Sequence, residues 1–153
     1  MHTYDYSVEI AAPIEDVFAF DSDPENWAKT MPSLKNLEII DETDDTVTLR
    51  ATQHVLGQSI PVEMVRTIED PNTRFVVSVE GEGTSGEVEN RFVETETGTR
   101  IDHHSEFEYG DSLLDRIMEP IVARFNNRMF RTHLEHTQDL LEAEHAAETT
   151  IEA

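Results

Sequence analysis

Hydrophobic and polar residues alternate along most of the first two thirds of the chain, a pattern typical of half-buried β-strands. Residues 3–11 show it first, and the apolar residues on one face are Tyr4, Tyr6, Val8 and Ile10. The pattern recurs from about residue 35 to residue 109, with turn signals between the segments. We expect six strands in this region, at 35–42, 46–55, 58–69, 74–81, 86–95 and 99–109. Because the connections are short, sequential strands should pair antiparallel.

Two short helices are predicted between the first two strands. Pro13 stands where the first would begin, since proline is favoured in the first turn of a helix. The second opens at Asp23 and Pro24, which are suited to the N-cap and to the first helical position. It carries Trp27, the only tryptophan of the chain, and should end near Met31.

A long helix is predicted from about residue 112 to about Glu144. Asp111 and Ser112 can cap its start, and Ser112 has capping-box spacing with Asp115. Pro120 lies inside it, so we expect a kink or a separate first segment there. Apolar residues follow the helical period in a wide stripe. They are Leu113, Leu114, Ile117, Met118, Ile121, Val122, Phe125, Met129, Phe130, Leu134, Leu140 and Leu141.

The order of these elements predicts an α+β fold. A seven-stranded antiparallel sheet with one apolar face must cover that face, and only the C-terminal helix is long enough. We therefore expect the sheet to wrap around this helix. The length of 153 residues fits one domain. That domain should span residues 1–144, followed by an acidic, frayed tail at 145–153.

One N-terminal run combines a strand that ends in Ala-Pro, an acidic pair before Val-Phe, and a later Asp-x-x-x-Trp. The residues are Val8-Glu9-Ile10-Ala11-Ala12-Pro13-Ile14-Glu15-Asp16-Val17-Phe18-Ala19-Phe20, Asp23-Pro24-Glu25-Asn26-Trp27 and Met31-Pro32-Ser33-Leu34. This run resembles the START-like (SRPBCC, Bet v 1-like) superfamily, in its polyketide cyclase/dehydrase and lipid-transport branch. The resemblance implies the helix-grip fold. It transfers no catalytic residue, because members of the superfamily carry lipids, bind hormones or quinones, cyclise polyketides or assist protein complexes.

Composition narrows the function classes. Lys and Arg total 11 against 33 Asp and Glu, a formal net charge of −22 that disfavours nucleic acids and anionic membrane surfaces. This charge resembles that of salt-in halophile proteins, and an ordinary acidic domain is the alternative. The absence of cysteine excludes disulfides, thiolate metal sites and a cysteine nucleophile. Without an apolar run of about 18–20 residues or a visible secretory signal, we expect no membrane insertion and a cytoplasmic location.

Candidate site residues follow from the alternation within the strands. It places Gln53, Arg66, Asn90 and His103 on the inner face of four strands, with Ser105 beside His103 and His104 outside. Buried polar groups need partners, so these residues either satisfy one another or contact a ligand. Arg66 could instead form a structural ion pair with Glu94 or with a carboxylate of a helix. The proposed ligand-binding set also includes Tyr109, Met118, Phe125 and Met129.

Three functions remain open. The first is a binding or carrier protein for a lipid, isoprenoid or quinone-like molecule held between sheet and helix. The second is a cyclase/dehydrase enzyme in which His103 acts as acid or base and Arg66 stabilises a developing enolate. The third is a protein-interaction or regulatory module with a filled interior. We expect no cofactor, and no metal because His133 and His136 lack a zincin pattern. A homodimer is left open.

Overall fold

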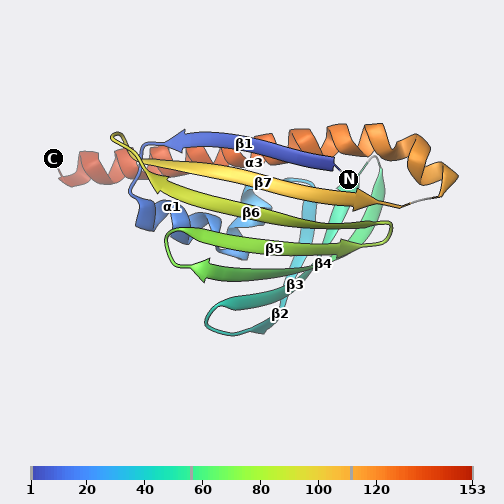
Figure 1. Ribbon diagram of the computed structural model, residues 1–153. Coiled ribbons are helices and arrows are strands. Elements are labelled where there is room, and N and C mark those ends of the chain that lie inside the picture. The colour runs from blue at the N-terminus through green and yellow to red at the C-terminus, as the bar shows by residue number, and fades with distance from the viewer. Residues whose placement is uncertain (1, 56, 111, 153) are drawn as a thin grey trace.

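The computed structural model describes residues 2–55, 57–110 and 112–152. Within them the chain forms one antiparallel sheet, two short helices and one long helix (Figure 1). The strands are β1 (His2–Ile10), β2 (Leu34–Glu42), β3 (Thr46–Val55), β4 (Gln58–Asp70), β5 (Arg74–Gly81), β6 (Thr84–Glu94) and β7 (Thr99–Tyr109). The helices are α1 (Ile14–Asp21), α2 (Pro24–Thr30) and α3 (Leu113–Glu152). The predicted α+β architecture is confirmed.

The sheet has the order β1-β7-β6-β5-β4-β3-β2. Strands β2 to β7 pair as consecutive hairpins, as their short connections require. Strand β1 forms one edge of the sheet by pairing with β7, with Tyr6 opposite His103. In Figure 1 the sheet curves and α3 lies along its β1 edge, which is the helix-grip arrangement. None of the helices in the described part of the chain is long and apolar enough to cross a membrane.

Helices α1 and α2 fill one end of the space under the sheet. The carboxylate of Asp23 accepts the backbone N–H of Glu25 at 3.0 Å, and Pro24 is the first helical residue, so the predicted cap is confirmed. In α1, the ring of Phe18 lies 5.0 Å from that of Phe92, and its edge meets Phe75. This aromatic cluster packs the interior at the α1–α2 end.

Helix α3 begins beside the predicted cap. The Ser112 hydroxyl accepts the backbone N–H of Asp115 at 3.1 Å, whereas Asp111 lies outside the described residues. The helix continues through Pro120, and its first turns bend away from the axis of the later turns (Figure 1). It extends to Glu152, past the predicted end near Glu144. Fraying of the last residues, and the division into a domain and a tail, stay predictions.

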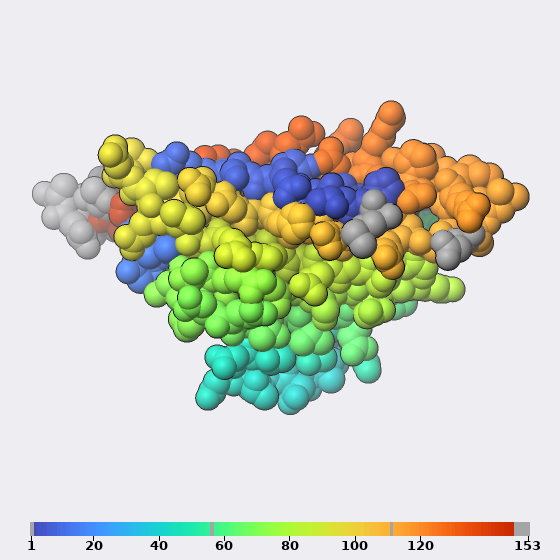
Figure 2. Space-filling model, in the orientation of Figure 1, coloured from blue at the N-terminus to red at the C-terminus, as the bar shows by residue number. Residues whose placement is uncertain are grey.

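The predicted apolar stripe of α3 is only partly buried. Phe130, Leu134 and Leu141 are buried against the sheet and the short helices, but near the start of the helix the exposed fraction reaches 77% at Leu113. The exposed members of the stripe are Leu113, Leu114, Ile117, Ile121 and Leu140. The first turns of α3 lie at one end of the molecule (Figure 2), where the first four of these side chains remain exposed. The stripe was therefore predicted wider than the face that the sheet covers.

Candidate functional site

A cavity of about 770 Å³ lies between the concave face of the sheet and α3, at the end that α1 and α2 leave unfilled. Strands β3 to β7 supply one wall, largely with valine, isoleucine, methionine and phenylalanine. Helix α3 supplies the opposite wall, and Trp27 of α2 closes one side. The volume falls within the range of about 300–1,000 Å³ typical of small-molecule sites.

The inner faces of β6 and β7 bring polar side chains to this cavity. His103 is 3% and Asn90 2% exposed, and the two face each other across the paired strands. His104, the next residue on β7, points outward and bonds to Asp5 at 2.6 Å. The alternation predicted for β7 is therefore confirmed as a matter of side-chain direction.

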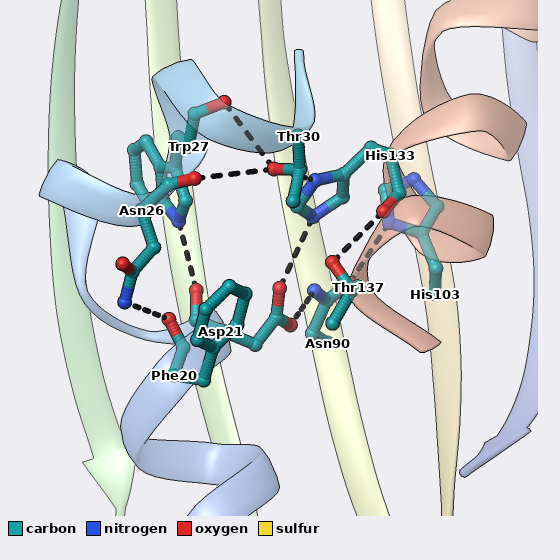
Figure 3. Close-up of polar contacts among 9 residues, drawn as sticks. All are labelled: Phe20, Asp21, Asn26, Trp27, Thr30, Asn90, His103, His133 and Thr137. Atoms are coloured by element: carbon teal, nitrogen blue, oxygen red, sulfur yellow. Dashed lines mark hydrogen bonds and ion pairs between the residues drawn. The ribbon is translucent and has the colours of Figure 1, made fainter. Parts of the chain in front are cut away.

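Asp21, the last residue of α1, anchors these polar groups (Figure 3). The Asn90 amide Nδ2 donates to Asp21 Oδ2 at 2.7 Å, which leaves Asn90 Oδ1 as the acceptor. The His103 Nδ1–H donates to that oxygen at 2.8 Å. In a neutral imidazole the other nitrogen accepts, and it receives the Ser105 hydroxyl at 3.1 Å. Both nitrogens of His103 are thus engaged by protein groups.

His133 of α3 meets the other oxygen of Asp21. Its Nε2–H donates to Asp21 Oδ1 at 3.1 Å, because a carboxylate only accepts. Its Nδ1 lies 2.7 Å from the Thr30 hydroxyl, which also lies 3.2 Å from the Trp27 carbonyl. When His133 is neutral, Thr30 donates to Nδ1; when His133 is charged, Nδ1–H donates to Thr30 and Thr30 donates to the carbonyl. Either way, both nitrogens of His133 are occupied (Figure 3).

Burial controls the electrostatics of this cluster. Desolvation lowers the pKa of His103 to about 4, and the nearby His133 contributes in the same direction. His103 is therefore neutral at pH 7. On the outer face, the hydrogen bond to Asp5 raises the pKa of His104 above its ordinary value. Two adjacent histidines thus have opposite shifts because their side chains point to opposite faces of the sheet.

A second polar group lies nearer the start of α3. The Tyr4 and Tyr109 hydroxyls are 2.8 Å apart, and the Asn126 amide donates to the Tyr109 hydroxyl at 2.6 Å. Burial is the main cause of the raised pKa of both tyrosines. Of these residues, Tyr109 and Asn126 line the cavity.

The structure brings most of the predicted site residues to the cavity. Those that line it are Gln53, Asn90, His103, Tyr109, Met118 and Met129. Three do not line it: Arg66, Ser105 and Phe125. The binding roles of all nine residues stay predictions.

Arg66 points to the inner face of the sheet, as predicted, but it lies at the end that α1 and α2 fill, outside the cavity. Its Nη1 donates to the Ser22 carbonyl at 2.9 Å and its Nη2 to the Asp45 carbonyl at 3.2 Å. The partners are therefore backbone carbonyls, and not the side chain of Glu94 or of a helix carboxylate that was considered as the alternative. Burial lowers the pKa of Arg66. Ser105 is fully buried behind His103, and Phe125 is half-buried on α3 outside the cavity. Alternation predicts a side chain's face but not its position along the strand.

Asp21, Thr30, His133 and Asn126 were not predicted as site residues. A signal was available on α3, where Asn126, His133 and Thr137 recur with Phe130 at helical spacing and are all buried. Asp21 and Thr30 end short helices, and no pattern marks them. Among the described residues, no three histidines or carboxylates are grouped so that they could hold a metal ion.

Comparison with known proteins identifies the family. The model of the family described as "Polyketide cyclase / dehydrase and lipid transport" matches residues 1–142. The chain therefore belongs to this family, within the START-like superfamily. No curated protein matches the chain.

Several solved structures share the fold. The protein TTHA0849 from Thermus thermophilus superposes with a TM-score of 0.83 at 17% identity, covering 94% of this chain and 99% of that one. A START superfamily protein from Mycobacterium smegmatis gives 0.76 at 17% identity, with the same coverage. The Zhui aromatase/cyclase from Streptomyces sp. R1128 gives 0.73 at 16% identity, covering 89% of this chain and 93% of that one. At sequence identities this low, the similarity shows that the fold is shared but does not show a shared activity.

Proposed function

We propose that the protein binds and carries a hydrophobic small molecule, of lipid, isoprenoid or quinone-like type, in the cavity between sheet and α3. The observation that carries this proposal is the cavity itself, about 770 Å³ with largely apolar walls. The description of the family includes lipid transport, which supports it. The cavity also counts against an interaction module with a filled interior. A cytoplasmic location and a homodimer stay predictions.

A cyclase/dehydrase activity is the second candidate, favoured by the family description and by the fold shared with the Streptomyces aromatase/cyclase. The hydrogen bonds weigh against it. A general base needs a free lone pair within reach of the substrate, but both nitrogens of His103 and of His133 bond to protein groups. The Arg66 guanidinium lies outside the cavity, where it cannot stabilise an enolate in it. We therefore favour binding over catalysis.

Trp27 offers a direct test, because the only tryptophan of the chain lines the cavity. Titration with an apolar fluorescence quencher, and native mass spectrometry of the purified protein, should report a bound small molecule. The Val88→Phe variant places a larger side chain in the cavity and should weaken binding at least tenfold. Val93→Phe is the matched control, since Val93 lies on the same strand and is 40% exposed. Equal binding by both variants, or no binding by the wild type, would refute the proposal.

A further inference from the structure

Assuming the proposed binding function, the charges and the open hydrogen-bonding atoms of the cavity define a ligand class. We propose that the cavity selects an uncharged hydrophobic molecule with an oxygen group, such as an alcohol or a ketone. Carboxylates and phosphates of the same chain length are excluded. This goes beyond hydrophobic binding, because fatty acids and fatty alcohols have equally apolar chains.

The lining of the cavity offers no cation to a ligand. No lysine or arginine lines the cavity among the described residues. Arg66, the arginine that points inward from β4, is held by the carbonyls of Ser22 and Asp45 away from the cavity. The carboxylates that line the cavity are those of Glu82, Asp115 and Glu119. An anionic ligand would meet negative charges and no compensating positive one.

The buried cluster of Asp21, Asn90, His103 and His133 carries no net positive charge either. His103 is neutral, and any positive charge on His133 is balanced by Asp21 at 3.1 Å. The cluster therefore offers no net positive charge to an anion. Burying an ionised group without an opposite charge is strongly unfavourable, whereas an alcohol or ketone needs only a hydrogen bond.

Two buried side-chain amides, those of Asn90 and Asn126, each have a hydrogen-bonding position without a partner among the described residues. Asn90 Nδ2 carries two hydrogens, and Asp21 takes one; within the described residues the other has no protein acceptor. Asn126 donates to Tyr109, while its carbonyl oxygen accepts no hydrogen bond from the described residues. Both side chains are at least nine-tenths buried and line the cavity. They can donate to a ligand oxygen and accept from a hydroxyl, so the open atoms match a neutral oxygen group.

The experiment compares four ligands of one chain length: decan-1-ol, decan-2-one, decanoate and decyl phosphate. Their dissociation constants are measured by Trp27 fluorescence at pH 8 in 1 M NaCl, where the Debye length is about 3 Å and repulsion by the net charge is screened. We expect the alcohol and the ketone to bind at least tenfold more tightly than both anions. Equal affinity for decanoate would overturn the ligand class and leave the cavity as a binding site. No binding by any of the four would instead overturn the proposed function.

A charge-introducing variant separates cavity chemistry from net charge. Gln53 lines the cavity, and His54 follows it on the exposed face of β3. Gln53→Arg should raise the affinity for decanoate at least tenfold, while His54→Arg should leave it unchanged. Thr84→Lys, also in the lining, serves if Gln53→Arg does not fold. Equal gains in the cavity variant and the surface control would show that net charge excludes anions, which would refute the inference.

Discussion

Asp21 and His133 lie 112 residues apart in the sequence, yet His133 Nε2 donates to Asp21 Oδ1 at 3.1 Å. Asp21 ends α1, and His133 lies in the middle of α3. The same carboxylate accepts from Asn90 of β6, so one side chain joins both helices to the sheet. Removing it should therefore affect more than one packing interface.

Asp21→Ala should lower the free energy of unfolding by about 2–6 kcal/mol. Two buried donors, on Asn90 and His133, would lose their acceptor, and each such group costs about 1–3 kcal/mol. Chemical denaturation measures the change. Glu63→Ala, on the exposed face of β4, is the control and should change the value by less than about 0.5 kcal/mol. A similar small loss in Asp21→Ala would show that the network contributes little.

The two adjacent histidines of β7 should titrate in different pH ranges. Burial lowers the pKa of His103 to about 4, whereas the hydrogen bond to Asp5 raises that of His104. In an NMR titration from pH 5 to pH 8, the His103 ring signals should stay constant while those of His104 shift. His104 is thus the internal control. A midpoint for His103 near its ordinary value would contradict the burial that we describe.

The same pKa shift makes stability depend on pH. The pKa of His103 is about 4 in the folded chain and about 6.5 in the unfolded chain, so unfolding takes up a proton between these values. Stability therefore falls as the pH drops from about 6.5 to about 4, by about 3 kcal/mol from this group. The His103→Phe variant should be less stable overall, because Asn90 and Ser105 lose a hydrogen-bond partner, but it should lose this part of the slope. Parallel slopes in the two proteins would contradict the assignment.

Tyr109→Phe should destabilise the fold by about 1–2 kcal/mol. The change removes hydrogen bonds of the Tyr109 hydroxyl with Tyr4 and Asn126, and a typical bond contributes about 0.5–1.5 kcal/mol. Tyr6→Phe is a matched control, because the Tyr6 hydroxyl makes no hydrogen bond with the described residues and its loss should cost less than about 0.5 kcal/mol. Thermal unfolding compares the two variants. Equal destabilisation by Tyr109→Phe and Tyr6→Phe would indicate that the hydrogen bonds of the Tyr109 hydroxyl do not stabilise the fold.

Salt should stabilise the protein. With a net charge of −22, repulsion within the chain opposes folding, and it is screened as the Debye length falls from about 30 Å at 0.01 M salt to about 3 Å at 1 M. We expect a gain of at least about 1 kcal/mol, or about 2–4 °C in Tm. Sucrose, which carries no charge, tests for general stabilisation by cosolutes. A Tm independent of NaCl would contradict the prediction and remove the support for a salt-adapted protein.

Much of the fold could be predicted because it depends on local periodicity. The alternation that puts His103 inside and His104 outside also defines the strand, and the Asp23-Pro24 start needs only neighbouring residues. The site was harder to predict. Arg66 lies on the inner face of the sheet, as predicted. Its position along β4 places its guanidinium beside the Ser22 carbonyl instead of in the cavity. Asp21 owes its role to partners on β6 and α3, which no short-range pattern contains.

The interior has two parts. At one end Phe18 packs on Phe75 and Phe92, and at the other end the cavity lies beside the first turns of α3. We therefore expect the aromatic end to be rigid and the cavity end to be the route by which a ligand reaches the interior. Amide hydrogens near Phe92 should exchange only on global unfolding, while those of residues 113–122 exchange through local opening. A ligand could then enter or leave through local opening of the first turns of α3, while the hydrogen bonds between the strands stay intact.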